Sequence, residues 1–208
     1  MSGIIAQNTL DNSGLVKAPA GGSDAWTFIS KTTASADATV SITSGIDSTY
    51  KLYLITLKDV HRADGSEAWL GFNLSTDGGS NYDATKTSNL FNTHHRENDT
   101  SASISYNDAQ DLAQSTADVN ISTGIELGVD SDASLCGTIY LYDPSNTTFV
   151  KHFLIKTAFM SYYSANPWTV NTNVGGYANT TSAVDAVQFK MNSGNIDAGD
   201  FCLYGLTT

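Results

Sequence analysis

The stretch VQFKMNSGNIDAGDFCLYGL, which spans residues 187–206, decides the fold class of this chain. Val187, Phe189 and Met191 alternate with polar residues, and this period of two is typical of a half-buried β-strand. A Ser-Gly-Asn turn follows, after which the alternation resumes at Phe201. The pattern predicts a closing hairpin whose second strand ties the C-terminal end of the chain into a sheet.

A looser version of the same pattern lies near the other end of the chain. Val40 and Ile42 form a short alternating run, and a Ser-Gly pair follows them. Ile46 and Asp47 then precede a second apolar run over residues 50–57. The two patterns together predict a paired sheet element, although the repeat is too weak to indicate a duplication.

Length and composition favour one large all-β domain. The chain has 208 residues, of which only 15% are charged, and much of its polarity comes from Ser, Thr and Asn. A domain of this size buries enough surface to fold without a metal or another cofactor, and we expect none. The net charge of −11 disfavours nucleic-acid binding because a polyanion would be repelled. No apolar run is long enough to span a membrane, so no membrane partner is expected.

Two further features of composition bear on the environment of the protein. Cys136 and Cys202 both lie in strand-like runs. They form a disulfide if those strands are neighbours, whereas two free and mostly buried thiols are the favoured alternative. The first six residues hold no basic segment and no long apolar core, so we expect no secretory signal peptide.

The chain divides into an N-terminal arm or linker, residues 1–24, and a β-sandwich domain, residues 25–208. Scattered apolar residues and a flexible Ala-Pro-Ala-Gly-Gly joint indicate the arm, and an edge strand followed by a loop is the alternative. Arms commonly fasten a subunit to its neighbours. The apolar residues of the arm are therefore candidate interface residues: Ile4, Ile5, Leu10, Leu15 and Val16.

From Trp26 onward, about nine or ten strands follow one another, and the only helical candidate is one or two turns within residues 107–114. The run over residues 50–59 is apolar on both faces, with Leu52 and Leu54 on one of them. That pattern indicates a central strand covered on both sides, or one covered by a partner subunit. Regular strand spacing and frequent turn signals predict a single β-sandwich of jelly-roll type.

Residue patterns that would indicate catalysis or metal binding are weak. His94 and His95 are adjacent, so on a strand they point to opposite faces and do not ligate one metal together. The acidic turns at 77–83 and 130–132 do not match an EF-hand loop and are interpreted as turns. Neither a nucleophile elbow nor a phosphate-binding loop is present. We predict that the protein is not an enzyme, with a spatial pair of carboxylates for glycoside hydrolysis as the open alternative.

Aromatic residues gather in the C-terminal half of the chain. Three fates are open to them, namely core packing, anchoring of a subunit interface and stacking on sugar rings. Tyr162, Tyr163 and Trp168 are the candidates for an interface. The whole group is Tyr140, Tyr142, Tyr162, Tyr163, Trp168 and Tyr177.

An ordered set of short motifs resembles a widespread group of tailed-bacteriophage proteins that is common in marine viral sequences. The resemblance covers the chain from about residue 30 to its end and leaves residues 1–24 outside. Each motif is of low specificity, and their order carries the resemblance. The motifs are TAS at 33–35, VSI at 40–42, GIDSTY at 45–50, LKDV at 57–60, STDGGSNY at 75–82, LYDPS at 141–145, GY at 176–177, SGNI at 193–196 and LYG at 203–205.

The resemblance implies an accessory structural protein of the virion, without catalytic residues. We expect a capsid decoration or cement protein on the particle exterior, assembled in the host cytoplasm. Its partners would be the major capsid protein or other virion proteins, together with copies of itself in a homo-oligomer. The alternative is a tail-fibre or receptor-binding module that recognises a host surface glycan.

Overall fold

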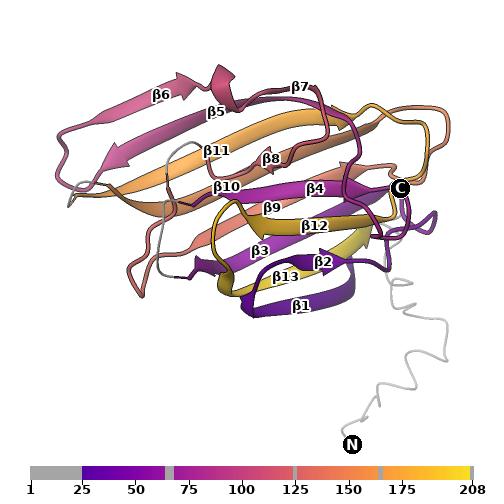
Figure 1. Cartoon of the computed structure of the whole chain (residues 1–208), viewed down its shortest axis with the longest axis horizontal. Coiled ribbons are helices and arrows are strands. Elements are labelled where there is room, and N and C mark those ends of the chain that lie inside the picture. Colours follow the sequence, from indigo (N-terminus) through magenta and orange to yellow (C-terminus); the bar gives the residue numbers. More distant parts are fainter. Residues whose placement is uncertain (1–24, 64–67, 124–125, 164–165, 207–208) are drawn as a thin grey trace, which may run out of the picture.

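The computed structural model describes residues 25–63, 68–123, 126–163 and 166–206. The candidate interface residues of the arm, residues 4–16, lie outside these ranges. The described residues form two antiparallel sheets and no α-helix, which confirms the all-β prediction. In Figure 1 the strands of the small sheet are seen over those of the large sheet, and β6 and β1 lie at opposite edges of the large one.

The large sheet has nine strands and the small sheet has four. The order in the small sheet is β2 (Val40–Ile42), β12 (Ala186–Met191), β4 (Leu70–Ser75) and β8 (Val119–Asn120). In the large sheet β7 (Leu112–Ser115) pairs with β5, and the remaining order is β1 (Thr27–Asp37), β13 (Ile196–Leu206), β3 (Leu52–Arg62), β9 (Leu135–Tyr142), β10 (Lys151–Tyr163), β11 (Asn166–Ala178), β5 (Lys86–Arg96) and β6 (Ala102–Tyr106).

The closing segment is not a hairpin, and that prediction is wrong. Strand β12 belongs to the small sheet, whereas β13 pairs with β1 and β3 in the large sheet. The Ser-Gly-Asn turn between them therefore carries the chain from one sheet to the other. Alternation of apolar and polar residues shows only that a strand has one buried face. It does not tell whether two successive strands are neighbours in one sheet or face each other across the core.

The resemblance between the two ends of the chain has a structural meaning. Like β12 and β13, strands β2 and β3 lie in different sheets and are joined through a Ser-Gly turn. Strand β2 pairs with β12, and β3 pairs with β13. The two patterns thus form one two-layered unit, which confirms the predicted paired sheet element.

The hydrophobic core lies between the two sheets. Phe72 of β4 contacts Phe153 of β10 with ring centroids 5.9 Å apart, and Phe189 of β12 contacts Phe201 of β13 at 4.9 Å. All four rings are fully buried. Each pair joins the small sheet to the large one, so aromatic packing holds the two layers together.

The number of strands and the helical candidate differ from the prediction. The described residues form thirteen strands rather than nine or ten, and the first extends over Thr27–Asp37 because it pairs along its length with β13. The helical candidate is reduced to a three-residue 3₁₀ turn, Asp108–Gln110, and the chain then enters β7. Asn107 makes no side-chain capping bond to this turn, and pairing with β5 competes with further helix.

The two cysteines are free thiols. Cys136 on β9 is exposed and Cys202 on β13 is half-buried, so the prediction of mostly buried thiols is wrong for Cys136. Strand β3 lies between β9 and β13 in the sheet. The two strands are therefore not neighbours, which was the condition for a disulfide.

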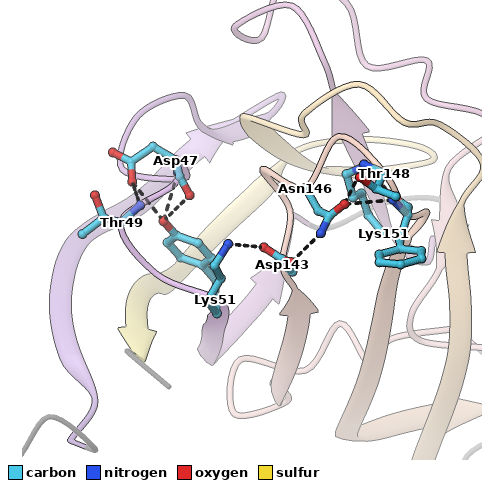
Figure 2. Close-up of polar contacts among 9 residues, drawn as sticks. Asp47, Thr49, Lys51, Asp143, Asn146, Thr148 and Lys151 are labelled. Carbon is cyan, nitrogen blue, oxygen red and sulfur yellow. Dashed lines mark hydrogen bonds and ion pairs between the residues drawn. The ribbon is translucent and has the colours of Figure 1, made fainter.

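A polar cluster closes one end of the sandwich (Figure 2). Lys51 Nζ lies 3.0 Å from Asp143 Oδ1, and Asn146 Nδ2 donates to Asp143 Oδ2 at 2.8 Å. Asn146 Oδ1 in turn accepts hydrogen bonds from the backbone N–H groups of Thr148 and Phe149. The turn at residues 143–146 is thus held by its own side chains. The bond from Asn146 and the neighbouring Lys51 lower the pKa of Asp143.

Candidate functional site

The outer face of the large sheet, turned away from the small sheet, carries a row of apolar side chains. Tyr53 and Ile55 of β3 point into the core and are fully buried, so Leu54 between them points outward. The strand register then places residues of five neighbouring strands directly opposite one another. We call these residues the apolar row: Phe28, Tyr204, Leu54, Tyr140 and Leu154.

Aromatic contacts extend the apolar row toward the start of the domain. The rings of Phe28 and Tyr204 lie 5.6 Å apart in an edge-to-face arrangement. Trp26 stands just before the edge strand β1, yet its ring centroid lies 6.3 Å from that of Tyr140, which is three strands away in the sheet order. The Trp26 ring therefore lies over this outer face.

Several large apolar side chains on this face are exposed to solvent. Phe28 is 56% exposed and Leu154 is 51% exposed. Phe91 of β5 and Tyr142 of β9 lie beside the row and are 43% and 37% exposed. Contiguous apolar surface of this kind is typical of a site of interaction.

A groove of about 560 Å³ runs along the row where it reaches β11. Gly175 continues the row next to Leu154, and Asn89 follows it on β5. Because Gly175 has no side chain, the outer face of the sheet has a depression between the side chains of Leu154 and Asn89. Tyr140 and Tyr142 line one part of the groove, and Lys156 and Asn173 add polar groups.

Charged pairs lie on the strands at one side of this apolar surface. Lys31 lies 3.0 Å from Asp200, and Lys58 lies 3.5 Å from Asp59. The side chain of Asp200 is 26% exposed and the other three are about half-exposed or more, so each pair contributes little to stability. An apolar centre with a polar rim is the usual anatomy of a protein–protein interface.

The three aromatic candidates from the sequence lie together at one end of the sheet. Tyr162 and Tyr163 stand at the end of β10, where their backbones pair with Pro167 and Asn166, and their side chains lie outside the described part of the structure. Trp168 on β11 pairs with Ser161 of the same strand β10. This end is distinct from the apolar row.

Trp168 is a half-buried packing residue. Its ring centroid lies 4.5 Å from that of His94, and the guanidinium carbon of Arg96 lies 4.2 Å from the ring centroid. The ring also packs against the edge of the hydrophobic core. A cation over an indole ring stabilises this end of β5 and β11.

The sequence singles out two members of the apolar row, Leu54 on the second apolar face of its strand and Tyr140 among the C-terminal aromatic residues, but it does not indicate the row itself. Leu154 stands between the buried residues Phe153 and Ile155, so an unbroken apolar run hides its outward direction. Phe28 and Tyr204 stand far apart in the sequence, and only the strand register makes them neighbours. The available signal was the second, outward apolar face of residues 52 and 54, which predicted that something covers this side.

The described residues offer no cluster of three His, Cys, Asp or Glu side chains that could hold a metal ion. Asp77, a calcium candidate, instead accepts hydrogen bonds from Ser75 and from Asn81, as expected for a turn. In the part of the chain that is described, no helix is long and apolar enough to cross a membrane. No family model, curated protein or solved structure matches this chain.

Proposed function

We propose that this protein is a non-enzymatic structural component of the exterior of a bacteriophage virion, and that it decorates and stabilises the capsid. The observation that carries the proposal is the apolar row, a continuous apolar surface across five strands of one sheet. The ordered motifs that resemble tailed-phage virion proteins support its assignment to a virion. The sandwich is proposed to be of jelly-roll type, and repeated crossing of the chain between the two sheets supports this.

The mechanism is burial of the apolar row against a neighbouring virion protein. Five strands at a spacing of about 4.8 Å make a strip roughly 20 Å wide. An interface of ordinary size buries about 800 Å² on each partner. Binding to the assembled shell and not to its separated subunits makes the shell harder to disrupt. The net charge of −11 keeps the unbound protein soluble.

Copy number on purified particles tests the location. A decoration protein is expected in hundreds of copies per particle, measured by quantitative gel densitometry against the major capsid protein. A few copies confined to the tail would contradict the proposal and favour the alternative below.

A pair of variants tests the surface. Leu154→Glu places a charge at the end of the apolar row that borders the groove, and it is expected to reduce binding to particles at least tenfold, because the glutamate would lose its hydration on docking. Ile104→Glu on the edge strand β6 is the matched control, since Ile104 is 71% exposed and stands outside the row. Co-sedimentation with particles measures both variants. Equal binding by the two variants would overturn the assignment of this face.

The alternative function is recognition of a host surface glycan by a tail-fibre or receptor-binding module. The groove favours it, because Tyr140 and Tyr142 offer faces for sugar stacking while Asn173 and Lys156 offer hydrogen-bond donors. A glycan array probed with the whole protein should then show selective binding that Tyr140→Ala abolishes. An array without hits would exclude this alternative for the glycans displayed.

A further inference from the structure

A lysine side chain is completely buried between the two sheets. Lys86 is the first residue of β5 and has no exposed surface. Its Nζ donates to Asn73 Oδ1 at 2.6 Å and to the Ala84 carbonyl oxygen at 2.6 Å, and it lies 3.4 Å from the Thr116 carbonyl oxygen. Asn73 belongs to β4 of the small sheet. The contact between Lys86 and Asn73 therefore joins the two layers of the sandwich.

Both the nitrogen and the oxygen of the Asn73 side-chain amide are hydrogen-bonded. Its Nδ2 donates to Asp118 Oδ1 at 2.7 Å and to the Thr116 carbonyl oxygen at 3.1 Å. Its Oδ1 also accepts the backbone N–H of Leu74 at 2.9 Å. Asn73 is only 3% exposed. An amine, an amide carbon and a carboxylate are thus assembled in a site largely shielded from water.

We propose that Lys86 and Asn73 form an intramolecular isopeptide bond, with Asp118 as the proton carrier. The lone pair of neutral Nζ attacks Cγ of Asn73, and the negative charge that develops on Oδ1 is stabilised by the N–H of Leu74. For this step Nζ leaves its hydrogen bond with Oδ1 and moves onto Cγ. The proton that it loses passes to Nδ2 through the Asp118 carboxylate, whose Oδ1 already accepts a hydrogen bond from Nδ2. The Cγ–Nδ2 bond then breaks and ammonia leaves. The product is a secondary amide between Nζ and Cγ, and no oxidant or other reactant is consumed.

The surroundings of Lys86 favour the neutral amine that this reaction requires. Burial lowers the pKa of Lys86 to about 8, against the opposing effect of Asp118 and Asp83. About a tenth of the amine is then neutral at pH 7. A surface hollow lined by Asn73, Thr116 and Asp118 gives the released ammonia a route to solvent.

Lys151 provides a control within the same molecule. It is also fully buried, it is the first residue of β10, and it pairs with Ala178 of β11 just as Lys86 does. Its Nζ donates to two backbone carbonyl oxygens, those of Phe149 and Thr180. These are main-chain amides rather than a side-chain amide held beside a carboxylate. We therefore expect Lys151 to keep its free amine.

Mass spectrometry of the whole, denatured protein tests the proposal. The expected mass is that of the chain less one molecule of ammonia. Trypsin cleaves after lysine and arginine, and residues 63–96 contain no such site except Lys86 and the terminal Arg96. An isopeptide bond blocks cleavage after Lys86, so the peptide 63–96 is expected intact and short by one ammonia. Cleavage after Lys151 should be normal.

Two results would overturn the proposal. One is the peptide 63–86 in full yield with an unmodified mass. The other is loss of ammonia with normal cleavage after Lys86, which would indicate a succinimide at Asn73 instead. Both readouts use the native chain and do not depend on the folding of any variant.

Variants then assign the roles. Lys86→Arg and Asn73→Ala each remove one reacting group and are expected to show no ammonia loss. Asp118→Asn keeps both reacting groups but removes the proton carrier, so the fraction cross-linked after a fixed time should fall at least tenfold. Complete cross-linking in Asp118→Asn would overturn the role given to that carboxylate.

Discussion

Gly45 and Gly194 occupy the Ser-Gly turns through which the chain passes from the small sheet to the large one. Both have a positive φ, +86° at Gly45 and +75° at Gly194, which side chains with a Cβ rarely adopt. Their surroundings differ. A Cβ at Gly45 would lie 2.6 Å from Cγ2 of Ile29, whereas a Cβ at Gly194 would meet nothing within 4 Å.

This difference predicts unequal effects of alanine at the two turns. Gly194→Ala should lower the free energy of unfolding by about 1–2 kcal/mol through backbone strain alone. Gly45→Ala should lower it by roughly a further 1–3 kcal/mol, because the overlap with Ile29 forces the packing to shift. Urea unfolding followed by tryptophan fluorescence measures both. Equal losses would show that Ile29 moves aside without resistance.

Asp143 makes the stability of the protein depend on acidity. Its pKa lies below the ordinary value of 3.8 in the folded protein, first because of the hydrogen bond from Asn146 and then because of Lys51 (Figure 2). The unfolded chain therefore binds a proton more readily than the folded one. Asp143 contributes its full stabilisation when the pH is above 3.8, the pKa of an ordinary Asp carboxyl. This contribution is lost as the pH falls through the lower pKa of Asp143 in the folded protein.

The variant Asp143→Asn tests this linkage. At neutral pH it should be less stable than the native chain, and the difference should shrink as the pH falls below about 4. Free energies of unfolding at a series of pH values give the comparison. A difference that stays constant across the series would mean that the Asp143 carboxylate titrates alike in both states.

At the scale of the element, the period of two in the sequence indicates the buried face of a strand. Val187, Phe189 and Met191 are predicted to share the buried face of a strand, and all three are buried while Gln188 and Lys190 between them are half-buried. Alternation succeeds because successive side chains of a strand point to opposite sides of the sheet.

The same local signal did not identify the partners of each strand. The last two strands looked like a hairpin because a short turn usually joins neighbours in one sheet. Instead, β12 and β13 are opposed across the core, where Phe189 meets Phe201. The apolar row was missed for a related reason. It is made by side chains far apart in the sequence, and only the register of the strands aligns them.

At the scale of the whole molecule, the proposed bond between Lys86 and Asn73 would tie β5 of the large sheet to β4 of the small one. A cross-link that closes a loop of roughly 15 residues stabilises a protein by about 3 kcal/mol, mainly by restricting the unfolded chain. The sandwich would then resist separation of its two layers. Such resistance would suit the proposed position on the outside of a particle.

Paired substitutions of the two buried lysines measure this contribution. Lys86→Met should unfold at a temperature roughly 6–12 °C below that of Lys151→Met, which corresponds to about 3 kcal/mol in a domain of this size. Both variants remove one buried amine that is hydrogen-bonded to backbone carbonyl oxygens, and only Lys86→Met also removes the proposed cross-link. Differential scanning calorimetry gives the two midpoints. Equal midpoints would contradict a covalent tie between the sheets.

The sequence by itself determined the all-β class, the buried faces of the strands and the positions of the turns. These are local properties, since alternation and turn chemistry depend on residues only a few positions apart. The tertiary structure alone decided which strands pair, which face each other across the core, and which residues meet on the outer face. It also brought Lys86, Asn73 and Asp118 together from three segments of the chain. Such contacts depend on long-range strand register, which no local pattern specifies.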